Sequence, residues 1–198
     1  MLIDTPHLVL RPVTKADVGT LVELDGDPEV MRYVSGGAPT PVETIADWVV
    51  PRALAAFAAR QGAGMWMAHE RRTGTFVGWF ALRSPRHSAV PELELAYRLR
   101  RTAWGLGYGT DGSVAVVRHA FENGPTARVF AGTMAVNAAS RRVMEKAGMR
   151  LAALHQTDDR AIDGYERGEV EYEILRADWE AGDPARAPRR SRHAHLIA

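Results

Sequence analysis

The hydrophobic pattern of the chain switches repeatedly between the two-residue period of strands and stretches bounded by helix-capping residues. In the segment 7–13, apolar and polar residues alternate, as they do in a strand with one buried face. The stretches predicted as strands are 7–13, 65–70, 75–82, 92–99, 128–136, 149–157 and 170–176. A short turn at 71–74 joins the second and third of these strands.

Helices are predicted where capping residues open a stretch and glycine closes it. Thr14, followed three positions later by Asp17, is a capping-box pair at the start of the first helix. Asp27-Pro28-Glu29 opens a short second helix, with proline in its first turn, and Gly36 ends it. These signals place two helices between the first and second strands.

The later helices carry similar signals. Thr40-Pro41-Val42-Glu43 predicts a long helix with Thr40 as its N-cap, running to about residue 60, and Pro51 is expected to kink or split it. The remaining helices are predicted over 111–121 and after the N-cap Asn137, with Gly148 ending the second.

The order of the elements is strand, helices, three strands, helix, strand, helix and two strands. It predicts an α+β (mixed α/β) single domain, with a mostly antiparallel sheet and one strand–loop–helix unit at its centre. Strict alternation of strands and helices is absent, which argues against a doubly wound dinucleotide-binding fold. We expect one domain over 1–180 and a basic, disordered tail over 181–198, because the tail is rich in proline and arginine.

Three glycines alternate with other residues in Trp104-Gly105-Leu106-Gly107-Tyr108-Gly109-Thr110, between a predicted strand and a predicted helix. Glycine lets backbone N–H groups approach a ligand closely, and free amides at a helix N-terminus favour an anion. The loop therefore predicts a ligand that carries phosphate. Its spacing differs from the dinucleotide-binding fingerprint, and the lysine of a Walker A loop is missing.

The amino-acid composition excludes several classes of protein. The 198 residues have a net charge of +1, with 46% hydrophobic and 25% charged residues, as in ordinary globular domains. No apolar run approaches the roughly 20 residues that span a bilayer. The chain has no cysteine, which excludes disulfides, thiolate metal ligands and a cysteine nucleophile. We expect a cytoplasmic protein with no membrane partner and no specific nucleic-acid partner.

Four segments of the chain together carry a family resemblance: 7–12, 27–31, 94–97 with 104–110, and 137–149. They resemble the GNAT superfamily of N-acetyltransferases and, within it, the RimJ/RimL-like group that acetylates the N-termini of ribosomal proteins. The glycine loop is similar to the family's acyl-CoA pyrophosphate motif. The resemblance covers about residues 3 to 180.

The resemblance implies a GNAT fold, in which the parallel central strands 92–99 and 128–136 part into a V-shaped splayed sheet that holds the arm of coenzyme A. It implies an acetyl-CoA-dependent N-acyltransferase whose acceptor is a primary amine, on a peptide or protein N-terminus or on a small molecule. Because cysteine is absent, the amine is expected to attack the thioester directly in a ternary complex. A homodimer is compatible with the resemblance.

Residue roles follow from the resemblance position by position. The residues expected to bind acetyl-CoA are Leu99, Arg101, Trp104, Gly105, Leu106, Gly107, Tyr108, Gly109, Thr110, Asn137 and Ser140. Glu94 is the expected general base, acting through water, and Glu92 on the same strand face is the alternative. Ser140 is expected to protonate the leaving thiolate. Many relatives use a tyrosine for this step, and none stands near Ser140 in the sequence.

Each role has a structural alternative. Glu94 would otherwise make a structural hydrogen bond or ion pair, Asn137 a plain helix N-cap, and Ser140 a first-turn serine. Arg100, like Arg101, either pairs with phosphate or stays on the surface. For the whole chain, the alternatives are a non-catalytic acyl-CoA-binding module and a succinyl-CoA-dependent transferase.

The histidines and the C-terminal tail are weaker candidates for catalytic or binding roles. His155 lies on a strand expected to lead toward the substrate, where it would serve as a base, although packing is the commoner role. His193 and His195 lie in the tail without a carboxylate cluster, so no metal site is predicted. The arginines of the tail offer a surface for acidic partners or RNA, but solvated chain is the simpler interpretation.

Overall fold

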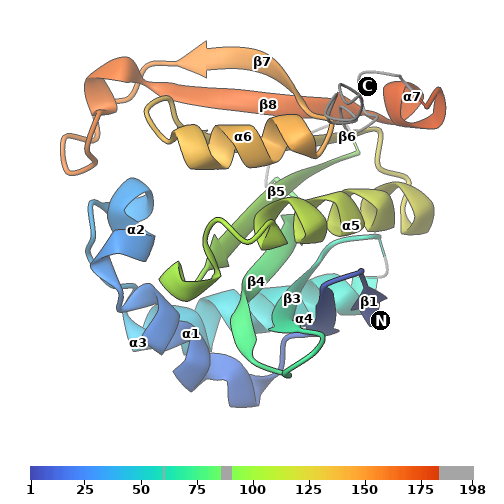
Figure 1. Cartoon of the computed structure of the whole chain (residues 1–198), viewed down its shortest axis with the longest axis horizontal. Helices are drawn as coiled ribbons and strands as arrows, with labels where there is room; N and C mark the ends of the chain where they lie inside the picture. The colour runs from blue at the N-terminus through green and yellow to red at the C-terminus, as the bar shows by residue number, and fades with distance from the viewer. Residues whose placement is uncertain (60, 86–90, 183–198) are drawn as a thin grey trace, which may run out of the picture.

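The computed structural model describes residues 1–59, 61–85 and 91–182 of the chain. An eight-stranded sheet, in the order β1-β2-β3-β4-β5-β6-β8-β7, forms its centre (Figure 1). The strands are β1 (Ile3–Asp4), β2 (Leu8–Pro12), β3 (Gly64–Glu70), β4 (Phe76–Arg83), β5 (Glu92–Leu99), β6 (Arg128–Met134), β7 (Arg150–His155) and β8 (Glu169–Leu175). Among these eight described strands, only β5 and β6 pair in parallel. The predicted α+β fold with a mostly antiparallel sheet is confirmed, and β1 is an additional edge strand.

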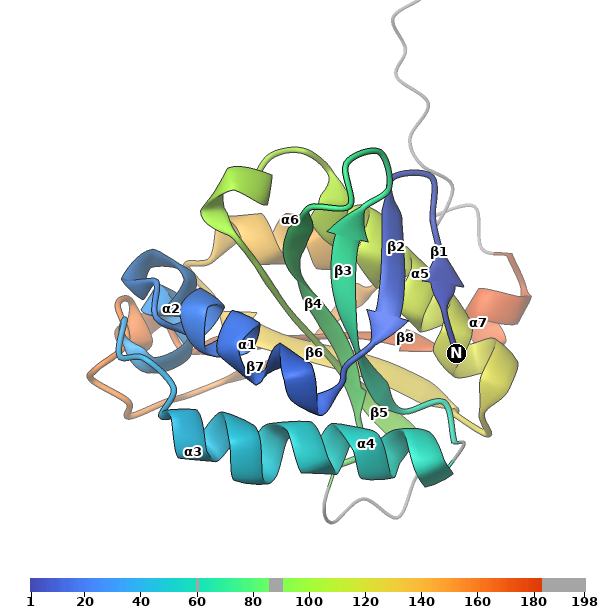
Figure 2. The ribbon, with the colours of Figure 1, turned by 90° about the horizontal axis from the view of Figure 1, so that it is seen from below.

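Helices cover both faces of the sheet (Figure 2). The helices are α1 (Val18–Asp25), α2 (Pro28–Ser35), α3 (Val42–Thr44), α4 (Val50–Ala59), α5 (Tyr108–Asn123), α6 (Ala138–Lys146) and α7 (Arg176–Glu180), with shorter turns η1 (Lys15–Asp17), η3 (Arg101–Ala103) and η4 (Tyr165–Arg167). On β4, Phe80 joins the core under α5, and its neighbour Trp79 joins the core under α1 and α4. The two-residue period thus divides the apolar side chains between two cores.

The long helix expected after residue 40 is continuous but changes its hydrogen-bond register before Pro51. α3 leads directly into a π-helical segment, η2 (Ile45–Val49), and then into α4 (Figure 2). The N–H of Val50 donates to the carbonyl of Ile45, five residues back. This wider turn comes directly before a residue that has no N–H to donate.

The buried carboxylate of Asp25 explains why the predicted N-cap Thr40 was wrong. The Thr40 hydroxyl donates to the Asp25 Oδ2 atom at 2.6 Å, and Arg98 of β5 forms an ion pair with the same oxygen. Asp25 is 4% exposed, and a buried carboxylate requires such donors. The helix therefore begins after Pro41, with no side-chain cap.

β5 and β6 part soon after they begin. Their parallel register joins Glu92, Leu93 and Glu94 to Arg128, Val129 and Phe130, and ends there. The guanidinium of Arg128 holds the closed end: it pairs with Glu92 and Glu173 at 2.8 Å each, and with Glu171. These hydrogen bonds to carboxylates outweigh partial burial and raise the pKa of Arg128. The predicted splayed sheet is confirmed.

Helix α5 lies close against β4 because Gly112 has no side chain. A Cβ atom at this position would lie 2.2 Å from the ring of Phe80. A side chain there would force either the buried Phe80 ring or the helix to move. This contact sets the distance between α5 and the sheet, and therefore also the position of the glycine loop that precedes α5.

Asp17 is a buried carboxylate held by four donors. It accepts from Arg11 Nη1 at 2.8 Å and Nη2 at 2.5 Å, and from the N–H and hydroxyl of Thr14 at 2.7 and 2.9 Å. Burial raises the pKa of Asp17, but the hydrogen bonds from Arg11 and Thr14 outweigh it and lower the pKa to about 2. The predicted pairing of Thr14 with Asp17 is confirmed.

We predict that Asp17→Asn lowers the free energy of unfolding by about 2 kcal/mol at pH 7. The depressed pKa means that this contribution is complete above about pH 4, the range of an unfolded aspartate, and disappears as the pH falls through about 2. Urea unfolding at pH 7 and thermal unfolding over a pH series would measure it. Asp4→Asn is the control, because Asp4 pairs with Arg71 in an exposed position and should contribute little. A wild-type advantage that stays constant down to pH 2 would contradict the assignment.

Candidate active site

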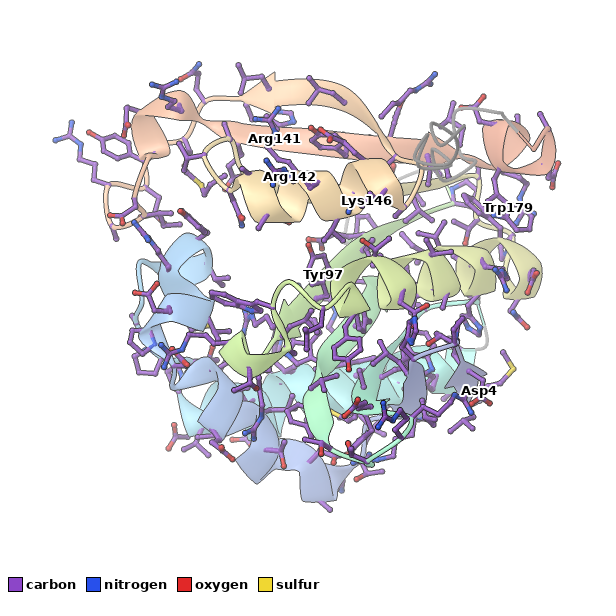
Figure 3. All side chains as sticks on the ribbon, in the orientation of Figure 1. Asp4, Tyr97, Arg141, Arg142, Lys146 and Trp179 are labelled. Atoms are coloured by element: carbon purple, nitrogen blue, oxygen red, sulfur yellow. The ribbon has the colours of Figure 1, made fainter. Side chains whose placement is uncertain are left out.

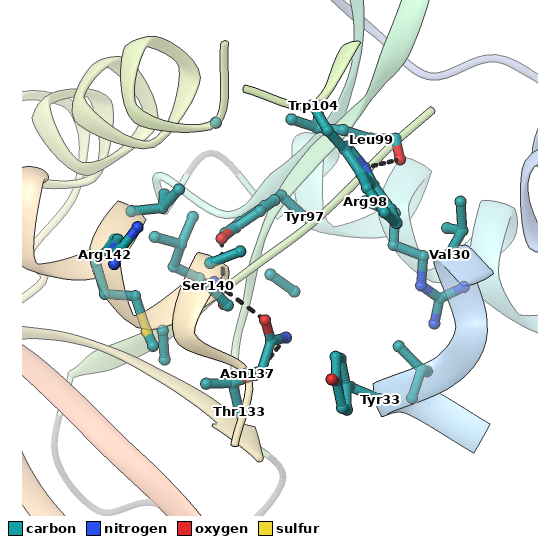
Figure 4. A pocket seen from close by; sticks show the side chains of 18 of the residues that line it. Val30, Tyr33, Tyr97, Arg98, Leu99, Trp104, Thr133, Asn137, Ser140 and Arg142 are labelled. Carbon is teal, nitrogen blue, oxygen red and sulfur yellow. Dashed lines mark hydrogen bonds between the residues drawn. The ribbon is translucent and has the colours of Figure 1, made fainter. Parts of the chain in front are cut away.

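A cavity of about 820 Å³ lies where β5 and β6 part. Residues of β5 from Glu94 to Leu99 and of β6 from Ala131 to Met134 line it, which is where the two strands no longer pair. The start of α6 forms another wall, and Val30 and Tyr33 of α2 face it across the cavity (Figure 4). The open edges of two strands thus meet residues from two helices, α2 and α6.

The glycine loop borders one end of the cavity. Gly105 and Gly107 have φ angles of 76° and 85°, which disfavour any other residue. Gly107 is the N-cap of α5, so the helix begins three residues earlier than predicted and includes Gly109 and Thr110 in its first turn. The free amides of that turn lie at the cavity.

Most of the residues predicted to bind acetyl-CoA line this cavity. They are Leu99, Trp104, Gly105, Gly107, Gly109, Thr110, Asn137 and Ser140. Three others do not line it. Arg101 pairs with Asp27 at 2.7 Å, Tyr108 donates to Glu70 at 3.1 Å, and the side chain of Leu106 is 59% exposed. Roles in binding remain predictions for all of these residues.

The two arginines before the loop attach it to the N-terminal helices. Arg101 pairs with Asp27, the N-cap of α2, and Arg100 pairs with Glu23 of α1 at 3.0 Å. Carboxylates therefore already partner both guanidinium groups that were expected to pair with phosphate or remain on the surface. The contacts orient η3 and the loop that follows it.

Two cations on α6 were not predicted. Arg142 and Lys146 line the cavity from one face of the helix, and Figure 3 labels both along α6, next to α5. Neither forms an ion pair with any of the described residues. Their four-residue spacing was a usable signal, because residues four apart share a helix face.

Ser140 forms hydrogen bonds with Asn137 at the start of α6 and with Tyr97 of β5. Its N–H donates to the Asn137 Oδ1 atom at 3.1 Å, which confirms Asn137 as the N-cap of α6. The Asn137 side chain in turn donates to Thr133 of β6 at 3.1 Å, and the Tyr97 hydroxyl of β5 donates to the Ser140 Oγ atom at 3.1 Å (Figure 4). Asn137 therefore links α6 to one parted strand and Tyr97 links it to the other.

Tyr97 contacts Ser140, although no tyrosine stands near Ser140 in the sequence. The two residues are 43 positions apart, so the sequence around Ser140 carries no sign of the contact. Burial raises the pKa of Tyr97, although its hydrogen bond to Ser140 lowers it. The phenol therefore stays protonated at neutral pH and can donate.

The two candidate carboxylates have different surroundings. Glu92 pairs with Arg128 at the closed end of the strands and does not line the cavity. Glu94 lines the cavity, is partly buried, and forms no ion pair within 4.0 Å among the described residues. Of the two, only Glu94 is positioned to reach a ligand in the cavity.

The remaining sequence candidates lie elsewhere. His155 of β7 is 55% exposed, sits 3.6 Å from Glu171 and does not line the cavity. His193, His195 and the basic tail fall outside the described residues. In the part of the chain that the structure describes, no three His, Asp or Glu side chains are placed to hold a metal ion. None of the described helices is long and apolar enough to cross a membrane.

Comparisons with known proteins agree with this geometry. The profile of the Acetyltransferase (GNAT) domain family matches residues 7–150. A relative, the FsC-acetyl coenzyme A-N(2)-transacetylase of Aspergillus fumigatus, is 33% identical over 187 residues, covering 89% of this chain and 77% of the relative.

Similar solved structures share the fold. A GNAT-family acetyltransferase from Bacillus anthracis has a TM-score of 0.71 and 22% identity over 89% of this chain and 99% of its own. RimL, a ribosomal alpha-N-protein acetyltransferase in complex with coenzyme A, has a TM-score of 0.72 and 17% identity over 88% of this chain and 98% of its own.

The chain belongs to the GNAT family of acetyltransferases, because the family profile covers most of its length. It is an N-acetyltransferase, and acetyl-CoA is the acetyl donor of this family.

Proposed function

We propose that this chain transfers the acetyl group of acetyl-CoA to a primary amine. The amine attacks the thioester directly while both substrates are bound, and residues 1–180 form the catalytic domain. The observation that carries the proposal is the cavity between the parted strands. The glycine loop and α6 border it on one side, and Glu94 borders it on the other. Two substrates can therefore meet inside the sheet from opposite faces.

The coenzyme A half is assigned to the glycine loop and the start of α6. The amides of Gly107, Gly109 and Thr110 bind the pyrophosphate, because a helix N-terminus favours an anion. Arg142 and Lys146 add positive charge at the same cavity. We assign the amide side chain of Asn137 and the open edge of β5 to binding the polar pantetheine arm.

The reaction needs a proton acceptor and a proton donor. The nitrogen of the acceptor loses two protons, one before it attacks and one after the bond to carbon has formed. Both protons leave through water and Glu94. The carbon–nitrogen bond forms, the carbon–sulfur bond breaks, and Ser140 gives its proton to the thiolate. Tyr97 restores that proton along its hydrogen bond to Ser140 and is itself reprotonated from solvent. Backbone N–H groups on the open edge of β5 bind the carbonyl oxygen as it gains charge.

Within the family, we assign the chain to the RimJ/RimL-like group. The segments 7–12 and 27–31 support this assignment, and so does the likeness to the RimL fold. RimL is named for transfer to a protein alpha-N group, and the Aspergillus relative for transfer to an N(2) nitrogen. Both names support an amine acceptor, on a peptide or on a small molecule.

We expect acetyl-CoA and a panel of primary amines to reveal transfer. The panel contains the standard amino acids, their carboxamides and short peptides, and coenzyme A release is followed with a thiol reagent. At least one amine should raise release well above hydrolysis. Calorimetric binding of acetyl-CoA without any amine-dependent turnover would identify a non-catalytic acyl-CoA-binding module instead.

We predict that Gly107→Glu weakens acetyl-CoA binding by at least about 100-fold, measured by calorimetry. A side chain here points into open space, where the pyrophosphate is assigned, and its carboxylate repels the phosphates. Gly74→Glu is the matched control, because Gly74 also has a positive φ, of 72°, and open space around it, but lies in the β3–β4 turn. Equal affinity in both variants would refute the loop assignment.

We predict that Ser140→Ala lowers kcat by about 100-fold and Tyr97→Phe by about 10-fold, while acetyl-CoA affinity changes little. The backbone N–H of residue 140 still donates to Asn137 in the alanine variant, so α6 keeps its cap. The double variant should be no slower than Ser140→Ala alone, because Tyr97 acts through Ser140. Unchanged turnover in Ser140→Ala would leave this serine a structural residue.

A further inference from the structure

The face of β4 and β5 away from α5 carries two cross-strand pairs that each contain an arginine. Trp79 lies opposite Arg98, and Arg83 lies opposite Glu94. Side chains of directly opposed antiparallel residues stand on the same face. Between the two pairs the register joins Ala81 to Ala96, and the small residue Ala96 lines the cavity together with Arg83 and Glu94.

The three arginines that line the cavity near this face differ in their partners. Arg98 pairs with the buried Asp25, and Arg32 of α2 pairs with Asp163 at 2.9 Å. Arg83 forms no ion pair within 4.0 Å among the described residues; its guanidinium lies over the ring of Trp79, 5.5 Å from the centroid. Of these three arginines, Arg83 alone has no ion-pair partner among the described residues.

Burial makes this lack of a partner costly. Desolvation lowers the pKa of Arg83, although the nearby charge of Glu94 raises it. A charged group in a partly dry site is stabilised by an anion that forms charge-assisted hydrogen bonds with it. Arg83 offers a planar fork of donors that fits a carboxylate, at the edge of the space where a substrate must lie.

We propose that the acceptor of this acetyltransferase is an amino acid or a similar amine with a free carboxylate beside it, and that Arg83 binds that carboxylate. The inference rests on the proposed function and names the substrate class. Arg83 and Glu94 are opposed residues whose Cβ atoms lie about 5 Å apart. An amine one carbon from a carboxylate matches this arrangement: the carboxylate meets Arg83, and the amine faces Glu94 through water.

The same carboxylate chemistry has a second source, the acyl group of succinyl-CoA. The position of Arg83 favours the acceptor. Arg83 shares its sheet face with Glu94, whereas the glycine loop and α5 lie on the other face. An acyl group arrives attached to coenzyme A from that other side. The two sources predict different kinetics.

The test compares kcat/KM for amino acids and their carboxamides, with acetyl-CoA as donor. The wild type should prefer the acid form of its best acceptor by about 30-fold, the range expected for a charge-assisted pair. Arg83→Gln should reduce that preference to about threefold or less, and Arg83→Lys should restore part of it. Acetyl-CoA affinity, measured by calorimetry, should be unchanged in both variants, which also shows that they are folded.

Arg52→Gln is the matched control. Arg52 of α4 lies outside the cavity and donates to the carbonyl of Ser84 at 2.9 Å, so its loss removes the same charge nearby. This variant should keep the preference for the acid. If it loses the preference as Arg83→Gln does, the effect is a general one of charge and the proposal is wrong.

Three further outcomes overturn the proposal. Equal use of acids and carboxamides by the wild type, or use of peptides alone, means that no carboxylate beside the amine is recognised. A wild-type preference for succinyl-CoA that Arg83→Gln reverses assigns Arg83 to the acyl donor. If no amine of any kind raises coenzyme A release, the proposed function itself fails.

Discussion

The ionic contact of Arg128 with three glutamates is the constraint on which the site depends. It joins β5, β6 and β8 at the one end where β5 and β6 still pair. Beyond Phe130 the strands separate, and the backbone groups on their facing edges have no strand partner. Unpaired edges inside a sheet are costly unless a ligand or water satisfies them. The closed end therefore holds open a slot that suits an extended, amide-rich ligand.

A single strand supplies both halves of the site, because its side chains alternate between the faces of the sheet. Tyr97 points to the α6 side and meets Ser140, whereas Glu94 and Arg98 point to the side of α1 and α4. A shift of β5 by one residue would exchange these sets and destroy both halves together. The six-residue register of β4 with β5, from Gly78–Leu99 to Arg83–Glu94, prevents such a shift.

Features set by neighbours in the sequence were predictable, and contacts between distant segments were not. The bounds of β5, the capping pair of Thr14 with Asp17 and the N-cap role of Asn137 all depend on residues within a few positions. The contact of Tyr97 with Ser140 and the attachment of Arg101 to Asp27 depend on how the sheet brings elements together. Thr40 failed for the same reason, since a carboxylate 15 positions away competes for its hydroxyl.

The absence of cysteine and the guanidinium of Arg83, unpaired among the described residues, together bear on how the enzyme selects its amine acceptor. In the proposed direct transfer, the amine and the thioester must be held together at the moment of reaction. In this proposal the thioester is held through coenzyme A, which is the same for every acceptor. That choice therefore falls to the few cavity groups not already neutralised by the fold. Arg32 and Arg98 are committed to Asp163 and Asp25, so on the face of β5 that carries Glu94 we propose that the choice of acceptor rests on Arg83 and Glu94.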